Sequence, residues 1–400
     1  MTTEEFIRQH ENDDVATLAL KAARGGEVDV AFALRQIAGR QRARKKLPRW
    51  AATEGILYPP PLSMEQCSSE ATAAYKAALV ARCQPQRMVD LTGGFGVDFS
   101  YLARGASEAV YVERQETLCQ LALHNLPLLG LGHAEVVCAD ATDYLTTMPP
   151  ADLIYIDPAR RDDRGGRTFA IEDCTPNILA WRDTLLEKAP TVLVKLSPML
   201  DWRAAAQALG EAVTEVHIVA AGHECKELLL WMERTPRPLT VVCKDDDYTE
   251  CFSAGSVTGD LRHWAEVRIE EGRRRWLLEP YAPLMKAGFF AVLETRYGVR
   301  QIAANSHLFI AEDEEKAVRF PGRCFEIEGM GSLNKKELKR LLQGVSRAQI
   351  SVRNFPLKAE ELRKRLRLAD GGDTCLFATT LPDGSHVIIR GKRGRFFSQQ

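Results

Sequence analysis

The pattern of apolar and polar residues divides the chain into a helical beginning, an alternating middle and a mixed end. Between residues 87 and 243, short apolar runs alternate with stretches of helical period. Runs that are apolar on both faces are typical of buried parallel strands, and intervening helices bring such strands into one sheet. The pattern therefore predicts an α/β fold with a doubly wound sheet of about seven strands in the middle of the chain.

The last two apolar runs of this region are predicted to form an antiparallel hairpin. Residues 216–220 and 228–232 are too close in sequence for the helical crossover that parallel strands need. The predicted loop between them, residues 222–227, mixes acidic and basic residues. Because ligands of such sheets bind at the loop edge, we expect Glu224 and Lys226 to contact a substrate. An ordinary solvated loop is the alternative.

Composition narrows the class of protein. The chain has 400 residues, 45% hydrophobic and 27% charged, with a formal net charge of −1, so attraction to a polyanion depends on local basic patches. Its ten cysteines include no C-x-x-C pair, which argues against a disulfide framework or a zinc site. The N-terminus lacks the apolar core of a signal peptide, and no long apolar run follows. We therefore expect a cytoplasmic protein that does not enter a membrane.

A glycine-rich turn follows the first strand of the predicted sheet. Residues 88–98 read MVDLTGGFGVD, and glycines let a backbone turn sharply and approach a ligand closely. Phe99 stands where a dinucleotide-binding fingerprint has a small residue, which argues against a nicotinamide cofactor. The remaining pattern resembles the first motif of class I S-adenosylmethionine (SAM) methyltransferases. Its residues here are Asp90, Thr92, Gly94 and Gly96, with Thr92 at a position that is often glycine.

Two acidic residues at the ends of later strands are candidates for binding the adenosine of SAM. Glu113 ends the second predicted strand, roughly twenty residues after the glycines, the spacing at which an acid meets a ribose. Asp140 ends the third strand, where the resemblance implies an acid near the adenine amino group. Strand-terminal acids also commonly cap helices, which is the alternative for Asp140 taken alone.

The resemblance also implies cofactor contacts near the helix that is predicted after residue 68. Helices at this place flank the cofactor in class I methyltransferases, so Gln66 and Ser69 are candidate cofactor contacts. Ser69 is followed by Glu70, a combination suited to capping a helix. Capping alone is therefore the alternative for Ser69.

The fourth predicted strand ends in Asp157 and Pro158, followed by Ala159 and Arg160. This segment resembles the Asp-Pro-Pro-aromatic motif of methyltransferases that act on exocyclic amines of bases. Such an amine is a poor nucleophile, and groups that accept its protons would hold its lone pair toward the methyl group. Asp157 and the Pro158 carbonyl are thus the candidate catalytic groups. Ala159 and Arg160 depart from the motif, although a guanidinium can also stack on a base. A turn-forming Asp-Pro pair is the alternative.

Basic residues near this strand are candidates for holding phosphate. Arg160 and Arg161 begin an arginine-rich segment, and Lys195 ends the fifth predicted strand, beside the proposed site. Contacts from such cations to phosphate position a nucleic acid. Further basic stretches lie at residues 40–46 and along the C-terminal region, where aromatic residues join them in the tail. Solvated helix faces are the alternative for these stretches.

Other sequence blocks give a resemblance over nearly the whole chain. They are residues 65–70, 156–158, 224–229, 279–288 and 354–356. With them, the protein resembles a bacterial family of class I methyltransferases that ends in a THUMP-like domain, and its core is similar to small-subunit rRNA guanine-N2 methyltransferases. The resemblance implies five parts. They are an N-terminal helical region (1–61), a Rossmann-like methyltransferase domain (62–245), a linker (246–276), a ferredoxin-like module (277–318) and an α+β THUMP-like, RNA-binding domain (319–400).

These observations predict a SAM-dependent methyltransferase that modifies an exocyclic base amine in rRNA or tRNA, with guanine N2 favoured. THUMP domains bind RNA, so the resemblance implies an RNA partner. No metal is expected, because the sulfonium already activates the methyl group. Two alternatives stay open. One is a methyltransferase for proteins or small molecules, and the other is a non-catalytic RNA-binding protein with a vestigial SAM fold, which the departures at Ala159 and Arg160 favour.

Overall fold

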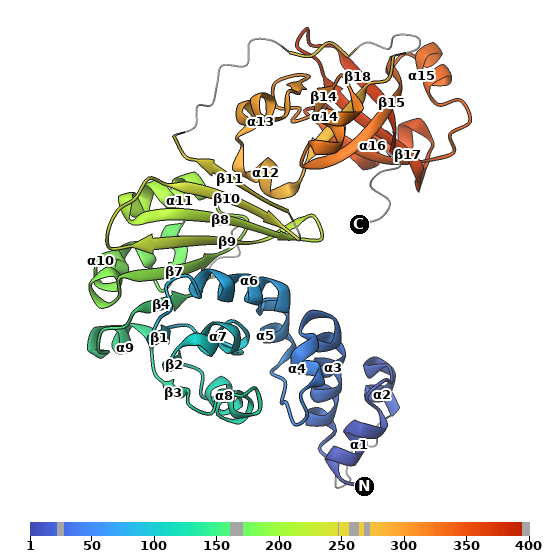
Figure 1. Ribbon diagram of the computed structural model, residues 1–400. Coiled ribbons are helices and arrows are strands. Elements are labelled where there is room, and N and C mark those ends of the chain that lie inside the picture. Colours follow the sequence, from blue (N-terminus) through green and yellow to red (C-terminus); the bar gives the residue numbers. More distant parts are fainter. Residues whose placement is uncertain (22–27, 161–170, 247, 256–263, 268–272, 394–400) are drawn as a thin grey trace. The chain divides into compact units, whose positions relative to one another are not determined.

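The chain divides into two units in the computed structural model, and each is described by itself (Figure 1). Unit 1 comprises Met1–Ala221 and Cys225–Val242, and unit 2 comprises Gly222–Glu224 and Cys243–Gln400. The structure describes residues 1–21, 28–160, 171–246, 248–255, 264–267 and 273–393. Within these ranges, no helix is long and apolar enough to cross a membrane.

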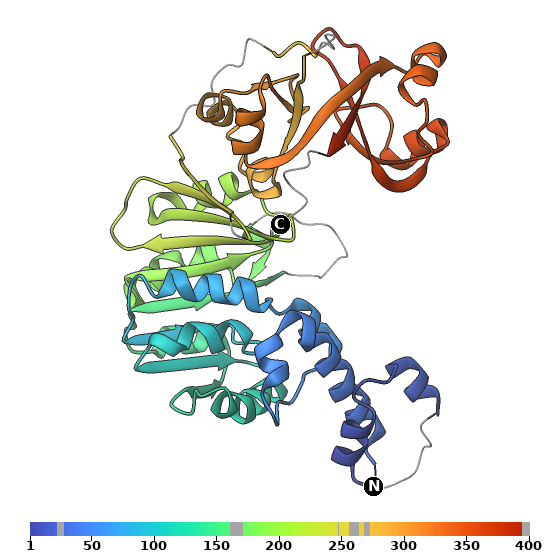
Figure 2. The same ribbon diagram turned by 45° about the vertical axis from the view of Figure 1, so that its right-hand side comes forward.

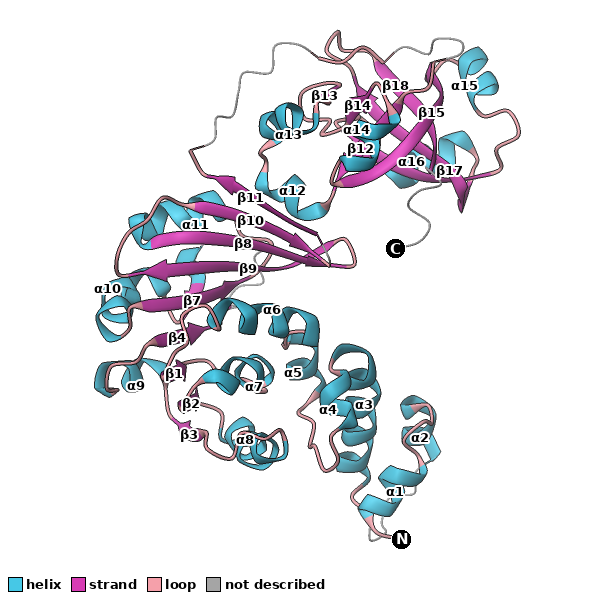
Figure 3. Cartoon of the chain, in the orientation of Figure 1, coloured by secondary structure: helices cyan, strands magenta, loops and turns pink. Residues whose placement is uncertain are grey.

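A nine-stranded sheet with the order β11-β10-β8-β9-β7-β4-β1-β2-β3 organises the first part of the chain (Figure 3). Strands β1, β2, β3, β4 and β7 pair in parallel, and β9 is antiparallel to β7. The predicted α/β fold is confirmed, and β10 and β11 extend the sheet beyond the seven predicted strands. The bounds are β1 Arg87–Asp90, β2 Glu108–Glu113, β3 Glu135–Cys138, β4 Leu153–Ile156, β7 Thr191–Leu196, β8 Val213–Ala221, β9 Glu224–Glu233, β10 Thr240–Asp245 and β11 Tyr248–Ser253.

Helices cover both faces of this sheet, as expected for strands that are buried on both sides. Figures 1 and 2 show α6, α7 and α8 on one face and α9, α10 and α11 on the other. Their bounds are α6 Glu70–Val80, α7 Val97–Leu102, α8 Glu116–Leu128, α9 Ala141–Thr147, α10 Ile178–Lys188 and α11 Trp202–Leu209. The short elements between them are η1 Ala103–Gly105, η2 Ile171–Asp173, η3 Gly210–Ala212 and the antiparallel pair β5 Ala159–Arg160 and β6 Cys174–Thr175.

The hairpin of β8 and β9 has a shorter turn than the sequence predicts. Only Gly222 and His223 separate the two strands, and Glu224 and Lys226 belong to β9 itself. The expected loop over residues 222–227 is therefore wrong in its extent. The pairing of Leu196 with Leu228 shows that β9 already runs beside β7 at this point, so the preceding residues continue as strand rather than as loop.

The N-terminal helices pack onto the sheet domain through aromatic and amide groups. Trp50 stacks in tilted geometry on Phe95 at 4.7 Å and donates to the Ser100 hydroxyl at 3.3 Å. Asn125 exchanges two hydrogen bonds with the backbone of Leu57, as a neighbouring strand would. The helices are α1 Thr3–Gln9, α2 Val15–Lys21, α3 Val30–Lys46, α4 Pro48–Ala52 and α5 Pro61–Gln66.

The basic run at the end of α3 has partners in the same region. Arg40 and Arg44 both pair with Glu11 at 3.3 Å. The Lys46 ammonium donates to the carbonyls of Met64 and Glu65 at 2.9 Å, near the end of α5. These cations therefore hold the helical region together through contacts within the protein, a role that neither the phosphate-binding prediction nor the solvated-face alternative anticipated.

Unit 2 is built on a seven-stranded sheet with the order β13-β14-β12-β15-β18-β17-β16. The predicted ferredoxin-like and THUMP-like segments thus share one sheet, and a turn through Asp383 and Gly384 joins the antiparallel strands β17 and β18. The strands are β12 Trp276–Pro280, β13 Arg300–Gln301, β14 Phe309–Ala311, β15 Gly322–Ser332, β16 Arg347–Arg353, β17 Ala369–Thr380 and β18 His386–Arg393. The helices are α12 Ala282–Ala287, α13 Phe290–Tyr297, α14 Glu314–Arg319, α15 Lys335–Leu341 and α16 Ala359–Leu366.

Alternation of side chains along β17 separates two apolar clusters in unit 2. Phe377 packs with Phe325 and Leu277 on one face. Leu376, its neighbour in sequence, packs on the other face with Leu362 of α16. A period of two residues is the expected pattern for a strand buried on both faces, so this sheet has a covered core on each side.

The first prediction concerns Gly93, which lies against the fully buried ring of Tyr111. A Cβ atom at Gly93 would lie 2.1 Å from a ring carbon of Tyr111. The ring cannot withdraw easily, because its hydroxyl donates to the Gly94 carbonyl at 2.5 Å. We expect Gly93→Ala to lower the free energy of unfolding by about 1–3 kcal/mol, the usual effect of overpacking a core.

Urea unfolding measures this effect, with Gly132→Ala as the matched control. A Cβ atom at Gly132 would meet no atom within 4 Å, so the control variant should unfold like the wild type. Equal stability of Gly93→Ala and Gly132→Ala would contradict the packing described here.

Candidate active site

The carboxyl ends of β1, β2 and β4 meet at the glycine-rich turn. The backbone N–H of Asp157, just after β4, donates to the Thr92 hydroxyl at 2.6 Å. The N–H of Gly94 donates to the Glu113 carboxylate, at the end of β2, at 3.0 Å. The sheet thus brings four of the predicted residues to one edge, which is where open α/β sheets bind their ligands.

The turn itself has the backbone geometry of a ligand cradle. Gly94 and Gly96 have φ angles of 56° and 85°, and residues that carry a Cβ atom rarely adopt such angles. The N–H of Gly96 donates to the Gly93 carbonyl at 2.9 Å, and α7 begins at the next residue. The turn therefore fits a nucleoside-bearing ligand such as SAM, because the glycine backbone can approach the ligand closely.

Asp90 lies under the turn rather than on its surface. Its side chain is buried, and it accepts a hydrogen bond from the Thr92 N–H at 2.9 Å. Burial raises the pKa of Asp90 well above its ordinary value, and the Thr92 hydrogen bond opposes this shift. Asp90 is thus a buried group that holds the backbone of the turn at Thr92.

The two candidate adenosine acids have different surroundings. Glu113 is buried, and its two oxygens accept the N–H groups of Gly94 and Gln115. Each carboxylate oxygen can accept a second donor, so these bonds leave room for a ribose hydroxyl. Asp140 is exposed and caps α9 by accepting the Thr142 N–H at 2.8 Å, which is the capping alternative raised for it.

The candidates before α6 lie at helix ends. Gln66 is the exposed last residue of α5. Ser69 caps α6, where its hydroxyl accepts the Thr72 N–H at 3.2 Å. The residue between them, Ser68, is the buried one, and it belongs to the charge network described below.

Asp157 and Lys195 form a close ion pair at the site. The Lys195 ammonium lies 2.5 Å from Oδ2 of Asp157, whose side chain is 37% exposed. Burial raises the pKa of Asp157, and Lys195 opposes this shift. Burial lowers the pKa of Lys195, but the carboxylates of Asp157 and Asp98 outweigh it and raise the pKa above its ordinary value. Lys195 is therefore a cation at neutral pH and cannot act as a base.

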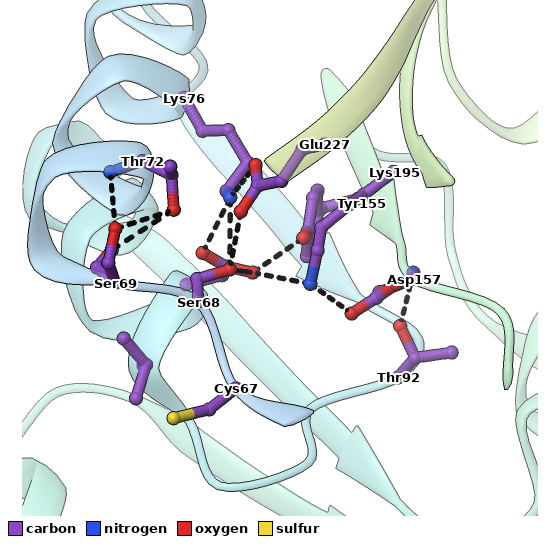
Figure 4. Close-up of polar contacts among 12 residues, drawn as sticks. Cys67, Ser68, Ser69, Thr72, Lys76, Thr92, Tyr155, Asp157, Lys195 and Glu227 are labelled. Atoms are coloured by element: carbon purple, nitrogen blue, oxygen red, sulfur yellow. Dashed lines mark hydrogen bonds and ion pairs between the residues drawn. The ribbon is translucent and has the colours of Figure 1, made fainter. Parts of the chain in front are cut away.

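A chain of alternating charges continues from this pair into the interior (Figure 4). Lys195 lies 3.6 Å from Asp98 on α7, and Asp98 lies 3.0 Å from the Lys76 ammonium on α6. Lys76 in turn lies 2.5 Å from Glu227 on β9. We call Glu227, Lys76, Asp98, Lys195 and Asp157 the charge chain. It links one half-exposed carboxylate to four buried charges.

Neutral groups add hydrogen bonds to the charge chain. The Tyr155 hydroxyl donates to Asp98 at 2.7 Å. The Ser68 hydroxyl accepts from Lys76 at 3.0 Å and lies within 3.0 Å of both Asp98 and Glu227. Buried charges are tolerated only when they are paired and hydrogen bonded. Oδ2 of Asp98 accepts both hydroxyls, whereas its buried Oδ1 has the Lys76 ammonium at 3.0 Å as an ion-pair partner and no hydrogen bond.

Sequence reasoning missed the inner members of the charge chain, although one signal was present. Lys76 occupies a buried position of α6, in the stripe formed with Ala73, Leu79 and Val80. A lysine in an apolar stripe is rarely buried without a carboxylate partner. This signal predicts a partner for Lys76 but does not identify Asp98 or Glu227, which come from distant parts of the sequence.

The remaining substrate candidates are dispersed. Arg160 lies in β5, paired with Cys174 of β6, and Arg161 lies outside the described residues. Glu224 and Lys226 are exposed at the start of β9. Of the predicted substrate residues, the structure places Lys195 in direct contact with Asp157.

Comparisons with known proteins extend over both units. The profile of a ferredoxin-like domain matches residues 276–321, and that of the THUMP domain-like family matches residues 322–393. A solved structure from Porphyromonas gingivalis W83, provisionally described as a methyltransferase, is 33% identical with a TM-score of 0.82. This match covers 98% of this chain and 97% of that one.

Two curated relatives have names that state an activity. An uncharacterized SAM-dependent methyltransferase of Mycobacterium tuberculosis is 24% identical over 364 residues, or 86% of this chain and 91% of the relative. An uncharacterized RNA methyltransferase of Thermosynechococcus vestitus is 31% identical over 102 residues, or 25% of this chain and 23% of the relative.

The second prediction follows from the environment of Asp98. Burial alone would raise its pKa, but Lys76, Lys195 and the hydroxyls of Tyr155 and Ser68 lower it to about 2. A carboxyl group with a lowered pKa in the folded state stabilises the fold above its ordinary pKa, and this contribution disappears as the pH falls from about 4 to about 2. We expect a loss of about 2 kcal/mol from this group over that range.

Urea unfolding between pH 2 and pH 5 tests this expectation. In Asp98→Asn, the free energy of unfolding should depend less steeply on pH than in the wild type. Some pH dependence should remain, because hydrogen bonds from His217 and Arg82 also lower the pKa of Glu215 to about 2 against its burial. Identical pH dependence in both proteins would show that Asp98 does not carry the charge assigned to it.

Proposed function

Because the chain belongs to the class I SAM-dependent methyltransferases that carry a THUMP-like domain, we propose that it methylates an exocyclic amine of an RNA base, with guanine N2 favoured. SAM supplies a methyl group that is already activated by its positive sulfur. The protein therefore has to bind SAM, present the amine in the right orientation and accept a proton.

The glycine-rich turn and Glu113 are the proposed cofactor-binding groups. The positive φ angles of Gly94 and Gly96 support this role, as does the position of Glu113 beside the Gly94 N–H. Thr92 joins this turn to Asp157. In the proposal, Asp140, Gln66 and Ser69 line the outer part of the same edge.

The single observation that carries the proposal is the position and exposure of Asp157. It follows β4 at the same edge as the turn, and its side chain is 37% exposed. Lys195 holds Oδ2, which leaves Oδ1 to accept an N–H of a substrate amine. The Pro158 carbonyl would accept the other N–H, so that the nitrogen lone pair points toward the methyl group.

The charge chain gives Asp157 a fixed direction in this proposal. A carboxylate alone at a strand end can rotate, whereas an ammonium at 2.5 Å restricts its oxygens to one orientation. After methyl transfer the nitrogen carries an extra proton, and Asp157 or water would take it. Lys195 is a positioning residue here, because its raised pKa keeps it protonated.

RNA as the substrate class is supported by the THUMP-like domain and by the relative named as an RNA methyltransferase. The short antiparallel pair of β5 and β6 directly follows Asp157 and Pro158. Arg160 in β5 occupies the motif position that is usually aromatic, and the proposal gives it the role of stacking on the target base.

The third prediction tests the role of Asp157. The assay measures transfer of labelled methyl from SAM to total RNA extracted from cells that lack this protein. We expect Asp157→Ala to reduce transfer by a factor of roughly 10² to 10⁴, the usual contribution of a positioned proton acceptor. SAM binding, measured by calorimetry, should change little, because Asp157 is not among the proposed SAM contacts.

Asp183→Ala is the matched control, since Asp183 is an 84% exposed carboxylate in the same unit. It should transfer methyl groups at the wild-type rate. Full activity of Asp157→Ala would remove Asp157 from the reaction. Binding of SAM by the wild type without transfer to any RNA would instead favour protein substrates or a vestigial enzyme.

A further inference from the structure

Unit 2 contains a buried carboxylate that is held by two arginines. Glu279 of β12 has a side chain that is 2% exposed. It accepts from Nε of Arg323 at 2.9 Å, and also from Nη2 of Arg323. Nη2 of Arg353 donates to its other oxygen at 2.6 Å. Strands β12 and β16 are not neighbours in the sheet, so Glu279 and Arg353 mark a place where the curled sheet brings distant strands together.

This cluster carries excess positive charge that solvent can reach. The side chains of Arg323 and Arg353 are 40% and 34% exposed, and Glu279 neutralises only one of them. Arg393 adds a third guanidinium, because it pairs with Phe325, two residues along β15 from Arg323, and therefore points to the same face. Each guanidinium has five N–H donors in a planar fork, a geometry that suits phosphate.

Buried polar atoms without partners lie around the same cluster. Among the described residues, the Thr379 hydroxyl, Nε of Arg353 and Nδ1 of His307 are buried without a hydrogen-bond partner. Thr379 is fully buried and pairs with Arg353 in the sheet. Unpaired buried polar atoms are uncommon in folded proteins, so these three groups keep hydrogen-bonding capacity for a polar ligand.

An exposed aromatic platform belongs to the same unit. The ring of His223 stacks on Tyr281 with centroids 5.0 Å apart and planes 3° apart. Asp245 holds His223 at 3.1 Å through Nδ1, while 57% of the histidine side chain stays exposed. Burial and Asp245 raise the pKa of Tyr281, and the charges of Arg393 and Arg323 lower it. The backbone places the two parts close together, because the N–H of Tyr281 donates to the Pro321 carbonyl at 3.2 Å and Glu279, two residues before Tyr281, pairs with Arg323 in the sheet.

We propose that the surface formed by His223, Tyr281, Arg323, Arg353 and Arg393, here called the arginine–histidine surface, binds an unpaired segment of RNA. This inference rests on the proposed function, because it takes the substrate to be RNA. Phosphates would contact the guanidinium groups, and one base would stack on the exposed face of His223. Unpaired bases have free faces for such stacking, whereas bases in a duplex do not.

The fourth prediction concerns the dependence of RNA binding on salt. Fluorescence anisotropy of a labelled twelve-nucleotide oligouridine with the full chain gives the affinity between about 50 and 200 mM salt. We expect Arg393→Gln to weaken binding and to reduce the slope of log affinity against log salt by about 0.7, the value for one lost phosphate contact on a single strand. Arg393 is the suitable position because it does not hold Glu279, so the fold should be retained.

Arg319→Gln is the matched control, since Arg319 is 69% exposed on α14 of the same unit. It should leave both the affinity and the slope at their wild-type values. The proposal is overturned if the wild type does not bind the oligonucleotide, or if the two arginine variants change binding equally.

His223→Asn tests stacking separately from charge. The φ angle of His223 is 63°, a conformation that asparagine tolerates well, so the turn should persist without the ring. The variant should bind about five- to 150-fold more weakly, the effect of losing one stacked base. Its salt slope should match the wild type. Unchanged affinity would remove the platform from the proposal.

These binding assays do not depend on methyl transfer. Loss of RNA binding in the surface variants, in a protein that transfers no methyl group, would uphold the arginine–histidine surface and reject the proposed function. Normal methyl transfer by surface variants whose RNA affinity is unchanged would uphold the proposed function and reject the arginine–histidine surface.

Discussion

Lys76 is a fully buried ammonium, and the geometry of the candidate active site depends on how its charge is compensated. Asp98 and Glu227 supply that compensation from α7 and β9. Removing one partner from a buried ion pair typically costs about 3–5 kcal/mol, because the other charge is left unpaired. These contacts therefore hold α6, α7 and β9 in fixed relation. Lys195 shares Asp98 with Lys76, so the same contacts set the position of the ammonium that holds Asp157.

The sequence predicted the parts of this arrangement that depend on local pattern. Alternating apolar runs and helices indicated the parallel sheet, and the turn at residues 92–96 was identified from its glycines. Chain order alone placed Glu113 and Asp157 at the carboxyl edge. The charge chain could not be predicted in the same way, because its members lie on four different elements and in the loop after β4. Lys76 interrupts an apolar stripe, which indicates a buried partner, but nothing local identifies Glu227 about 150 residues later.

Pairing rather than composition decides which basic residues are available to a polyanion. Arg40 and Arg44 belong to the most basic run of the N-terminal region, yet both contact Glu11. Glu279, in contrast, is shared by two arginines and leaves them with excess charge. The formal net charge of −1 therefore conceals a local surplus in unit 2. Its recognition required knowledge of which strands the curled sheet brings together, which periodicity does not provide.

The most direct test of the proposed chemistry is mass spectrometry of nucleosides from RNA that the purified protein has methylated with SAM. A carboxylate held beside a backbone carbonyl is suited to an exocyclic amine, which has two protons to donate. The methylated nucleoside should therefore carry its new methyl group on such an amine, with N2-methylguanosine favoured. A methyl group on a ribose hydroxyl or on a ring carbon would contradict the role assigned to Asp157.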